Sequence, residues 1–186
     1  MLLSALAPGD QPPAHTRSLR TVSPARDLPP CLDYIWQTYF EDIPRVNEVQ
    51  IAYCQPWKRR LGLIRLAEES GVTFIGINAL LQHELVPEYV LLITIAHELA
   101  HYAHGFGSPL PRRYRHPHAH NVVNHELDQR GLHEERRLCD EWIDKQWFAF
   151  YDMVQQSGWI EARVRHLPHS SSAGLAGPEL TDQVSE

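Results

Sequence analysis

The chain has 186 residues, of which 43% are hydrophobic and 22% charged, and a formal net charge of −6. This length and composition suit one globular domain with its own core, and the charge argues against a broadly basic nucleic-acid-binding protein. Three separated cysteines exclude a zinc ribbon or disulfide scaffold. Together with the lack of a convincing secretory signal or an apolar run of about 18 residues, they lead us to expect a cytoplasmic protein with no membrane span.

Two segments of low hydrophobicity flank the part of the chain that should fold. Residues 1–30 are rich in proline and show no apolar periodicity, and residues 166–186 are similar. Such segments bury too little surface to offset the entropy lost on ordering. We therefore expect a flexible N-terminal tail at 1–30, one folded domain at 31–165 and a flexible C-terminal tail at 166–186.

The first half of the folded part carries one helix signal and three strand signals. Apolar residues recur at helical spacing in CLDYIWQTYF (31–40), which predicts an amphipathic helix. The alternation in EVQIAYC (48–54) predicts a half-buried strand. RLGLIRL (60–66) and GVTFIGIN (71–78) predict two further strands, and the short link between them favours an antiparallel hairpin.

The second half predicts three helices. Pro87 and Gly105 bracket a segment that is apolar almost all round, which is typical of a central, buried helix. NVVNHELDQRG (121–131) predicts a short helix that ends at Gly131, and residues 133–158 predict a long C-terminal helix. The fold class is therefore α+β, with a small antiparallel sheet of about three strands packed with the central helix and flanking helices.

The central helix carries HELAH at residues 97–101. His97 and His101 are four residues apart, so both imidazoles lie on one face and can reach one metal ion. Glu98 lies about 100° round the axis, where its carboxylate can reach a metal-bound water. A chance match on so apolar a helix would bury these groups without partners, at about 1–3 kcal/mol each. The motif therefore predicts one catalytic Zn²⁺, held by the two histidines, with Glu98 as the general base.

A catalytic zinc site needs a third protein ligand, and the residues leave its identity open. His104 lies about 10 Å along the axis from His97, too far for the same ion, so we expect a solvent-facing or supporting imidazole there. The HExxHxxGxxH pattern fails, because the chain has His104 and Gly107 where that pattern needs glycine and histidine. The remaining candidates are His116, His118 and His120 in one loop, and Glu134 and Glu135 at the start of the last helix.

The order of these segments resembles the SprT-like metallopeptidases, the group that includes Spartan-type proteases. The resemblance covers about residues 33–132 and is carried by WKRRLG, FIGINALL, PEYVLLITIAHELAHY and VVNHELDQRGL. It implies a zincin-like minimal metallopeptidase whose third ligand is a histidine that opens a later helix, with an apolar residue four positions on. His118, followed by Val122, meets this condition, and His116 is the reserve.

The chain also departs from that family. Ala119 stands where glycine often follows the third histidine, and there is no cysteine zinc ribbon. The resemblance implies a protein or peptide substrate, with DNA-associated proteins as a possible class. The basic runs at 58–60 and 112–115 could add weak DNA binding. We further expect the strand at 71–78 to pair with an extended substrate along its edge.

Two other functions remain open at this point. One is a non-catalytic zinc-binding interaction module. The other is a regulatory peptidase of the ImmA/IrrE type, in which Glu134 or Glu135 supplies the third ligand. Retained hydrolysis separates the first alternative from a peptidase, and the identity of the third ligand separates the second. The sequence does not indicate an oligomeric state.

Overall fold

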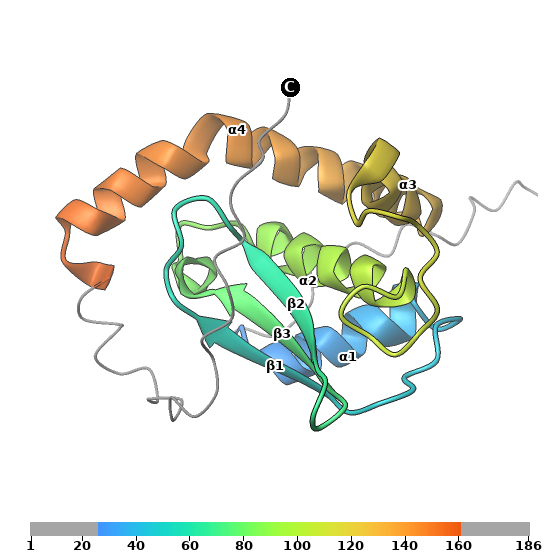
Figure 1. The fold of residues 1–186 in the computed structure, drawn as a ribbon. Coiled ribbons are helices and arrows are strands. Elements are labelled where there is room, and N and C mark those ends of the chain that lie inside the picture. The colour runs from blue at the N-terminus through green and yellow to red at the C-terminus, as the bar shows by residue number, and fades with distance from the viewer. Residues whose placement is uncertain (1–25, 161–186) are drawn as a thin grey trace, which may run out of the picture. The chain divides into compact units, whose positions relative to one another are not determined.

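The computed structural model describes residues 26–160. Residues 1–25 and 161–186, which include most of the expected N-terminal tail and all of the expected C-terminal tail, lie outside the described residues. The fold is α+β, as the sequence predicted (Figure 1). Its elements are α1 (Leu28–Tyr39), β1 (Val49–Cys54), β2 (Gly62–Ala67), β3 (Val72–Asn78), the 3₁₀ turn η1 (Ala79–Gln82), α2 (Glu88–Ala103), the 3₁₀ turn η2 (Ala119–Asn121), α3 (Val122–Gln129) and α4 (His133–Gln156).

The chain divides into two compact units within α4. Trp147 is the last residue of the first unit and Phe148 is the first residue of the second. In the second unit, the described residues are the last turns of α4 and a few residues beyond, and Phe148 and Met153 are exposed there. The sheet, α1, α2 and α3 belong to the first unit, and so does every residue discussed below as part of a site.

The three strands form one sheet in the order β1-β3-β2. β2 and β3 are antiparallel, which confirms the predicted hairpin. β1, however, is parallel to β3, with Ile51 opposite Ile75, so the sheet is mixed and the expected antiparallel arrangement is wrong for β1. β3 is also the central strand, paired along both edges, and cannot accept a substrate strand as we expected. The segment between β1 and β2 passes the end of β3, where Asn78 N donates to Leu61 O (2.8 Å). β2 therefore pairs with the edge of β3 opposite to β1.

One face of the sheet is covered by α1 and α2, which lie behind it in Figure 1. α1 packs mainly over β1, and α2 mainly over β2. Ile75 and Ile77 of β3 point into this layer and are fully buried. On the other face the sheet is partly exposed, and the guanidinium of Arg65 lies 5.1 Å from the centre of the Phe74 ring. Because only one face is fully buried, the strands keep the alternation that the sequence showed.

α2 is the centre of the core, in contact with α1, α3, β2 and β3. The helix begins directly after Pro87, which has no amide hydrogen to leave unpaired, and Gly105 follows its end with a φ of 78°. Both predicted ends are therefore confirmed. Tyr102 is fully buried, and its hydroxyl donates to Asn47 Oδ1 (2.8 Å) and accepts from Val46 N (3.1 Å).

α1 begins at Leu28, three residues before the expected start of the folded part, with prolines in its first turn. Arg26, just before it, donates hydrogen bonds to the carbonyls of Leu81, His83 and Val86. The proline content of this segment suggested a tail, yet proline suits the first turn of a helix, where an amide hydrogen is not needed.

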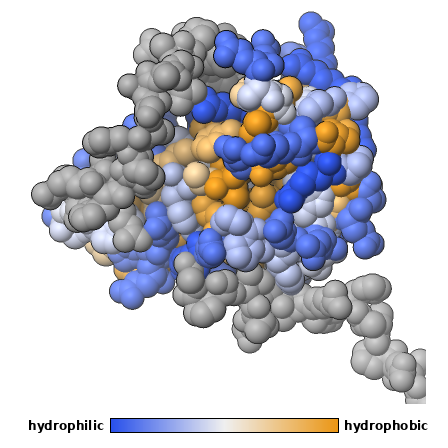
Figure 2. Space-filling model, turned by 90° about the horizontal axis from the view of Figure 1, so that it is seen from below, coloured by the Kyte–Doolittle hydropathy of each residue, from blue (hydrophilic) through white to orange (hydrophobic). Residues whose placement is uncertain are grey.

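Figure 2 views the molecule from below relative to Figure 1. On this face, hydrophobic residues gather in the middle and hydrophilic residues lie around them.

None of the described helices combines the length and the apolar character needed to cross a membrane.

Candidate metal centre

His97 and His101 project from adjacent turns of α2, as their spacing predicted. Their Nε2 atoms are 3.1 Å apart and their ring centroids 4.8 Å apart. His101 is buried, and His97 is half-buried. Two imidazole nitrogens at this separation can bind one ion, since bonds of about 2.0–2.1 Å at a tetrahedral angle place ligand atoms a little over 3 Å apart.

The structure brings His118 to this pair from the segment that precedes η2 and α3. Its ring centroid lies 4.7 Å from that of His101 and 5.6 Å from that of His97. One ring nitrogen from each of the three histidines lies within 4.8 Å of the others, and no second group of potential metal ligands occurs among the described residues. The side chain of His118 is exposed, so the three histidines form an open site at the surface of the first unit.

The other candidates for the third ligand lie outside this group. His116 and His120 are exposed. Glu134 is on the surface of α4, where its carboxylate accepts from Arg137 Nε at 3.2 Å, and Glu135 lies beside it in the first turn. Of the arrangements that the sequence left open, the geometry places only His118 next to the HELAH histidines.

Contacts within the loop after α2 position the segment that carries His118. Ser108 Oγ donates to the carbonyl of Tyr102 at 2.7 Å, and Arg113 N donates to the carbonyl of His104 at 3.0 Å. Gly105 makes this return possible, because a side chain there would meet the backbone of Pro111 at 2.5 Å. The loop therefore folds back over the end of α2 and carries the chain towards His97 and His101.

Burial keeps the two helical imidazoles neutral. It lowers the pKa of His97 to about 4 and that of His101 to about 3, and the proximity of the other histidines adds to both shifts. At neutral pH both rings therefore carry a free lone pair, the form that binds a metal ion. Nδ1 of His101 is buried and has no hydrogen-bond partner among the described residues. With the ring proton on this nitrogen, the lone pair lies on Nε2, the atom that faces His97 and would bind the ion.

Glu98 lies beside the histidines on α2 and is 5% exposed. Burial raises the pKa of its carboxyl group to about 8, and the positive charge of Arg60 opposes this shift. Its carboxylate lies against β2, where a methyl group on Gly62 would stand 2.5 Å from Glu98 Oε1. Gly62 is thus a residue of the site that sequence analysis did not identify, because only the packing of β2 on α2 shows why a side chain is excluded.

Asn78 is a second residue that sequence analysis missed. It is fully buried at the end of β3, and its Nδ2 donates to the carbonyls of Trp57 (2.7 Å) and Arg60 (2.6 Å). Its Oδ1 accepts from Leu80 N at 3.0 Å. Asn78 therefore holds the segment from Trp57 to Arg60, which leads into Gly62, the residue that lies against Glu98. Its position at the end of an apolar strand was the signal that could have found it.

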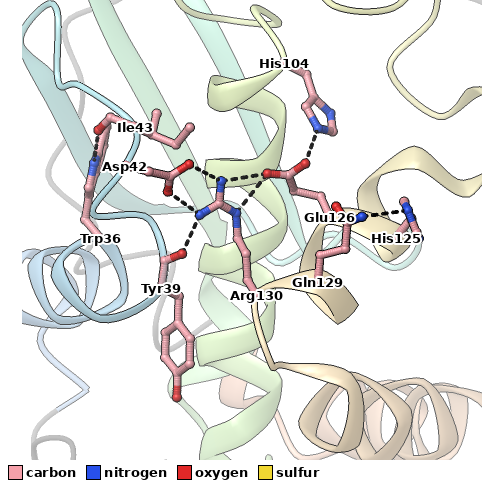
Figure 3. Close-up of polar contacts among 9 residues, drawn as sticks. All are labelled: Trp36, Tyr39, Asp42, Ile43, His104, His125, Glu126, Gln129 and Arg130. Atoms are coloured by element: carbon pink, nitrogen blue, oxygen red, sulfur yellow. Dashed lines mark hydrogen bonds and ion pairs between the residues drawn. The ribbon is translucent and has the colours of Figure 1, made fainter. Parts of the chain in front are cut away.

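His104 is fully buried, so the first of its two expected roles, a solvent-facing imidazole, is wrong, whereas that of a supporting imidazole stays a prediction. Its Nε2 lies 3.2 Å from Glu126 Oε2 on α3, and Glu126 in turn pairs with Arg130 (Figure 3). Glu126 and Arg130 are four residues apart, a spacing that predicts an ion pair on a helix, but the sequence does not show that His104 is their partner. As expected, His104 is not part of the histidine group.

Comparisons of the chain with protein-family models, with curated proteins and with solved structures find no significant match.

Proposed function

We propose that the protein is a zinc-dependent endopeptidase of the SprT-like kind, with a zincin-like site. His97, His101 and His118 would hold one Zn²⁺, and Glu98 would act as general base and then general acid. The observation that carries the proposal is the convergence of three imidazoles from two separate segments beside a buried carboxylate. Three protein ligands and an open side are the features of a catalytic zinc site, whereas structural sites are closed by a fourth ligand.

Zinc bound by these residues would polarise the scissile carbonyl and lower the pKa of a coordinated water to about 7. The protein's own part is the transfer of protons. The carboxylate of Glu98 would take a proton from the attacking water and deliver it to the nitrogen of the leaving amine. The raised pKa of Glu98 suits the second step, because a carboxyl group must be protonated to act as an acid. Arg60 already opposes the shift, and a zinc ion held by the three histidines would lower the pKa of Glu98 further, which favours the ionised form for the first step.

The sheet supports a peptide as the substrate. β2 is an edge strand, it packs on α2, and its first residue, Gly62, touches the carboxylate of Glu98. An extended peptide that pairs with the outer edge of β2 would pass next to the three histidines, with backbone hydrogen bonds supplying affinity. We therefore propose that β2, and not β3 as the sequence suggested, pairs with the substrate.

The cysteines support a reducing compartment, and we place the protein in the cytoplasm. Cys31, Cys54 and Cys139 are all free. Burial raises the pKa of Cys31 to about 11, with help from the charges of Glu88 and Asp27, and raises that of Cys139 to about 12. Thiols with such high pKa values are poor nucleophiles at neutral pH.

The test is to measure zinc stoichiometry and the hydrolysis of an unfolded protein substrate by the same preparation. One zinc per chain, loss of hydrolysis with a chelator and recovery with added zinc are expected. Zinc without hydrolysis would favour the interaction module over the peptidase. Absence of zinc binding at micromolar metal would overturn the proposal as a whole.

A further inference from the structure

The position of His118 depends on the backbone that follows it in the chain. His118 is exposed and precedes a 3₁₀ turn in which both His120 and Asn121 have a φ of 55°. Left-handed backbone at residues other than glycine is strained and persists only when the surrounding structure holds it. α3 follows at once, so the placement of α3 decides where the turn, and with it His118, can lie.

α3 cannot hold that position through its own stability. It has eight residues, and only Val123 and Leu127 are buried. Isolated helices shorter than about 12 residues are marginal in water, so contacts with other elements must fix α3. Two buried apolar side chains allow such a short helix to shift or rotate, whereas directional polar contacts do not.

A chain of polar contacts provides that direction (Figure 3). His104 Nε2, at the end of α2, lies 3.2 Å from Glu126 Oε2. Glu126 Oε1 accepts from Arg130 Nη2 at 2.7 Å and from Nε at 2.9 Å. Arg130 Nη1 also donates to the carbonyl of Tyr39 and, at 2.6 Å, to Asp42 Oδ1, just beyond α1. The contacts thus join α2, α3 and the end of α1.

The inner part of this chain is shielded from water. The side chains of His104, Glu126 and Arg130 are 0%, 12% and 11% exposed. Exposed ion pairs contribute little, but removing one partner of a shielded pair leaves an uncompensated charge. Nδ1 of His104 is buried without a partner among the described residues, so we assign the ring proton to Nε2, where Glu126 accepts it. The guanidinium of Arg130 then occupies the remaining side of the Glu126 carboxylate.

We propose that His104, Glu126 and Arg130 form a positioning clamp that sets the place of His118 over His97 and His101. None of the three contributes a ligand atom to the histidine group. The clamp acts through the backbone: it fixes α3 against the end of α2, and α3 fixes the turn that presents His118. The inference rests on the proposed metal site, since its consequence is tighter binding of a metal by the three histidines.

The experiment compares Glu126→Gln with Asp128→Asn. Asp128 is two residues further along α3 and makes an equally short ion pair, from Oδ1 to Arg136 Nε at 2.7 Å, but its partner is on α4. Zinc affinity is measured by competition with a chromophoric chelator, and the d–d absorption of the Co²⁺ form reports ligand geometry. Glu126→Gln should weaken zinc binding by about 10–100-fold, the range for groups that orient metal ligands, and should change the Co²⁺ spectrum. Asp128→Asn should do neither.

The double variant with His118→Ala tests the route of the effect. If the clamp acts through His118, Glu126→Gln should cause no further loss of affinity in the His118→Ala background. Arg130→Lys keeps the charge but loses the two-pronged contact, and it serves as the second probe should Glu126→Gln not fold. Equal zinc affinity in wild type and in the folded clamp variant would overturn the inference, and so would equal losses in the clamp variant and Asp128→Asn. Failure of the wild type to bind zinc would instead overturn the proposed function.

Discussion

The carboxylate of Glu98 and the backbone of Gly62 are in contact, so that a methyl group on Gly62 would lie 2.5 Å from Glu98 Oε1. Glu98 comes from the buried helix α2 and Gly62 from the edge strand β2. This contact places the proposed general base at the point where the edge strand begins. The side chain at position 62 therefore decides where the carboxylate can lie.

Gly62→Ala should lower hydrolysis sharply, because the added methyl group pushes the Glu98 carboxylate away from its place, while zinc content should stay near one per chain. Gly76→Ala is the matched control: its methyl group would meet Cys54 Sγ at 2.7 Å, an overlap of similar size on a sheet residue away from Glu98. Steady-state kinetics with zinc analysis would check both variants. Comparable activity losses in the two would contradict a specific effect on Glu98.

Glu98→Gln should retain the fold and the metal but lose peptide hydrolysis by about 10²–10⁴-fold, the usual scale for removal of a general acid–base group. The amide has nearly the same size as the carboxylate but cannot accept the proton of the attacking water. Turnover of an unfolded protein substrate would be measured on preparations of equal zinc content. Undiminished turnover would remove Glu98 from the mechanism.

His118→Ala should greatly weaken zinc binding, since only His97 and His101 would remain as ligands. The matched controls are His116→Ala and His120→Ala, two exposed histidines of the same loop that lie outside the metal group. Elemental analysis after dialysis against a weak chelator would report zinc per chain. Loss of zinc in Glu134→Ala or Glu135→Ala, with retention in His118→Ala, would point instead to a site of the glutamate-ligand kind.

The stability of the protein should fall in acid partly because of Glu126. The pKa of Glu126 is lowered from 4.5 to about 2, mainly by its hydrogen bond with His104 and further by its contacts with Arg130. Burial of the carboxyl group opposes this shift. A lowered pKa in the folded state contributes stability that is fully present above about pH 4.5 and is lost as the pH falls towards 2.

Urea denaturation between pH 2 and 7 would test this contribution. The wild type should lose more stability over the window from pH 4.5 to 2 than Glu126→Gln, which has no carboxyl group to protonate. Parallel curves for the two proteins would show that the carboxylate of Glu126 is not stabilised by its partners.

Weak, salt-sensitive binding to single-stranded DNA is expected if the substrates are DNA-associated proteins. Lys58, Arg59 and Arg60 precede β2, and Arg112, Arg113 and Arg115 lie in the loop that leads to His118; all six are exposed. If all six contact phosphates, the log–log salt slope for a single strand should be about −4. Fluorescence anisotropy at several salt concentrations would measure it, and a slope unchanged by Arg112→Ala/Arg113→Ala would contradict the role of the loop.

Local sequence patterns were enough to predict most of the helices and strands of this protein. α2 could be predicted from the apolar run before HELAH, with Pro87 before the helix and Gly105 after it, because the ends of a helix depend on the residues next to them. The four-residue spacing of His97 and His101 likewise placed both rings on one face, since the geometry of a helix is regular.

Only the tertiary structure decided how these elements meet. The pattern of β1 shows that it is a strand but not that it is parallel to β3, because its partner and direction depend on how the chain crosses the end of the sheet. The same holds for His104, whose burial depends on α3. His118 approaches His97 and His101 only because loop contacts, two left-handed residues and α3 bring it there. Contacts between residues distant in sequence leave no local periodicity. A single sequence therefore shows which residues could bind a metal, but not that they lie close together in the fold.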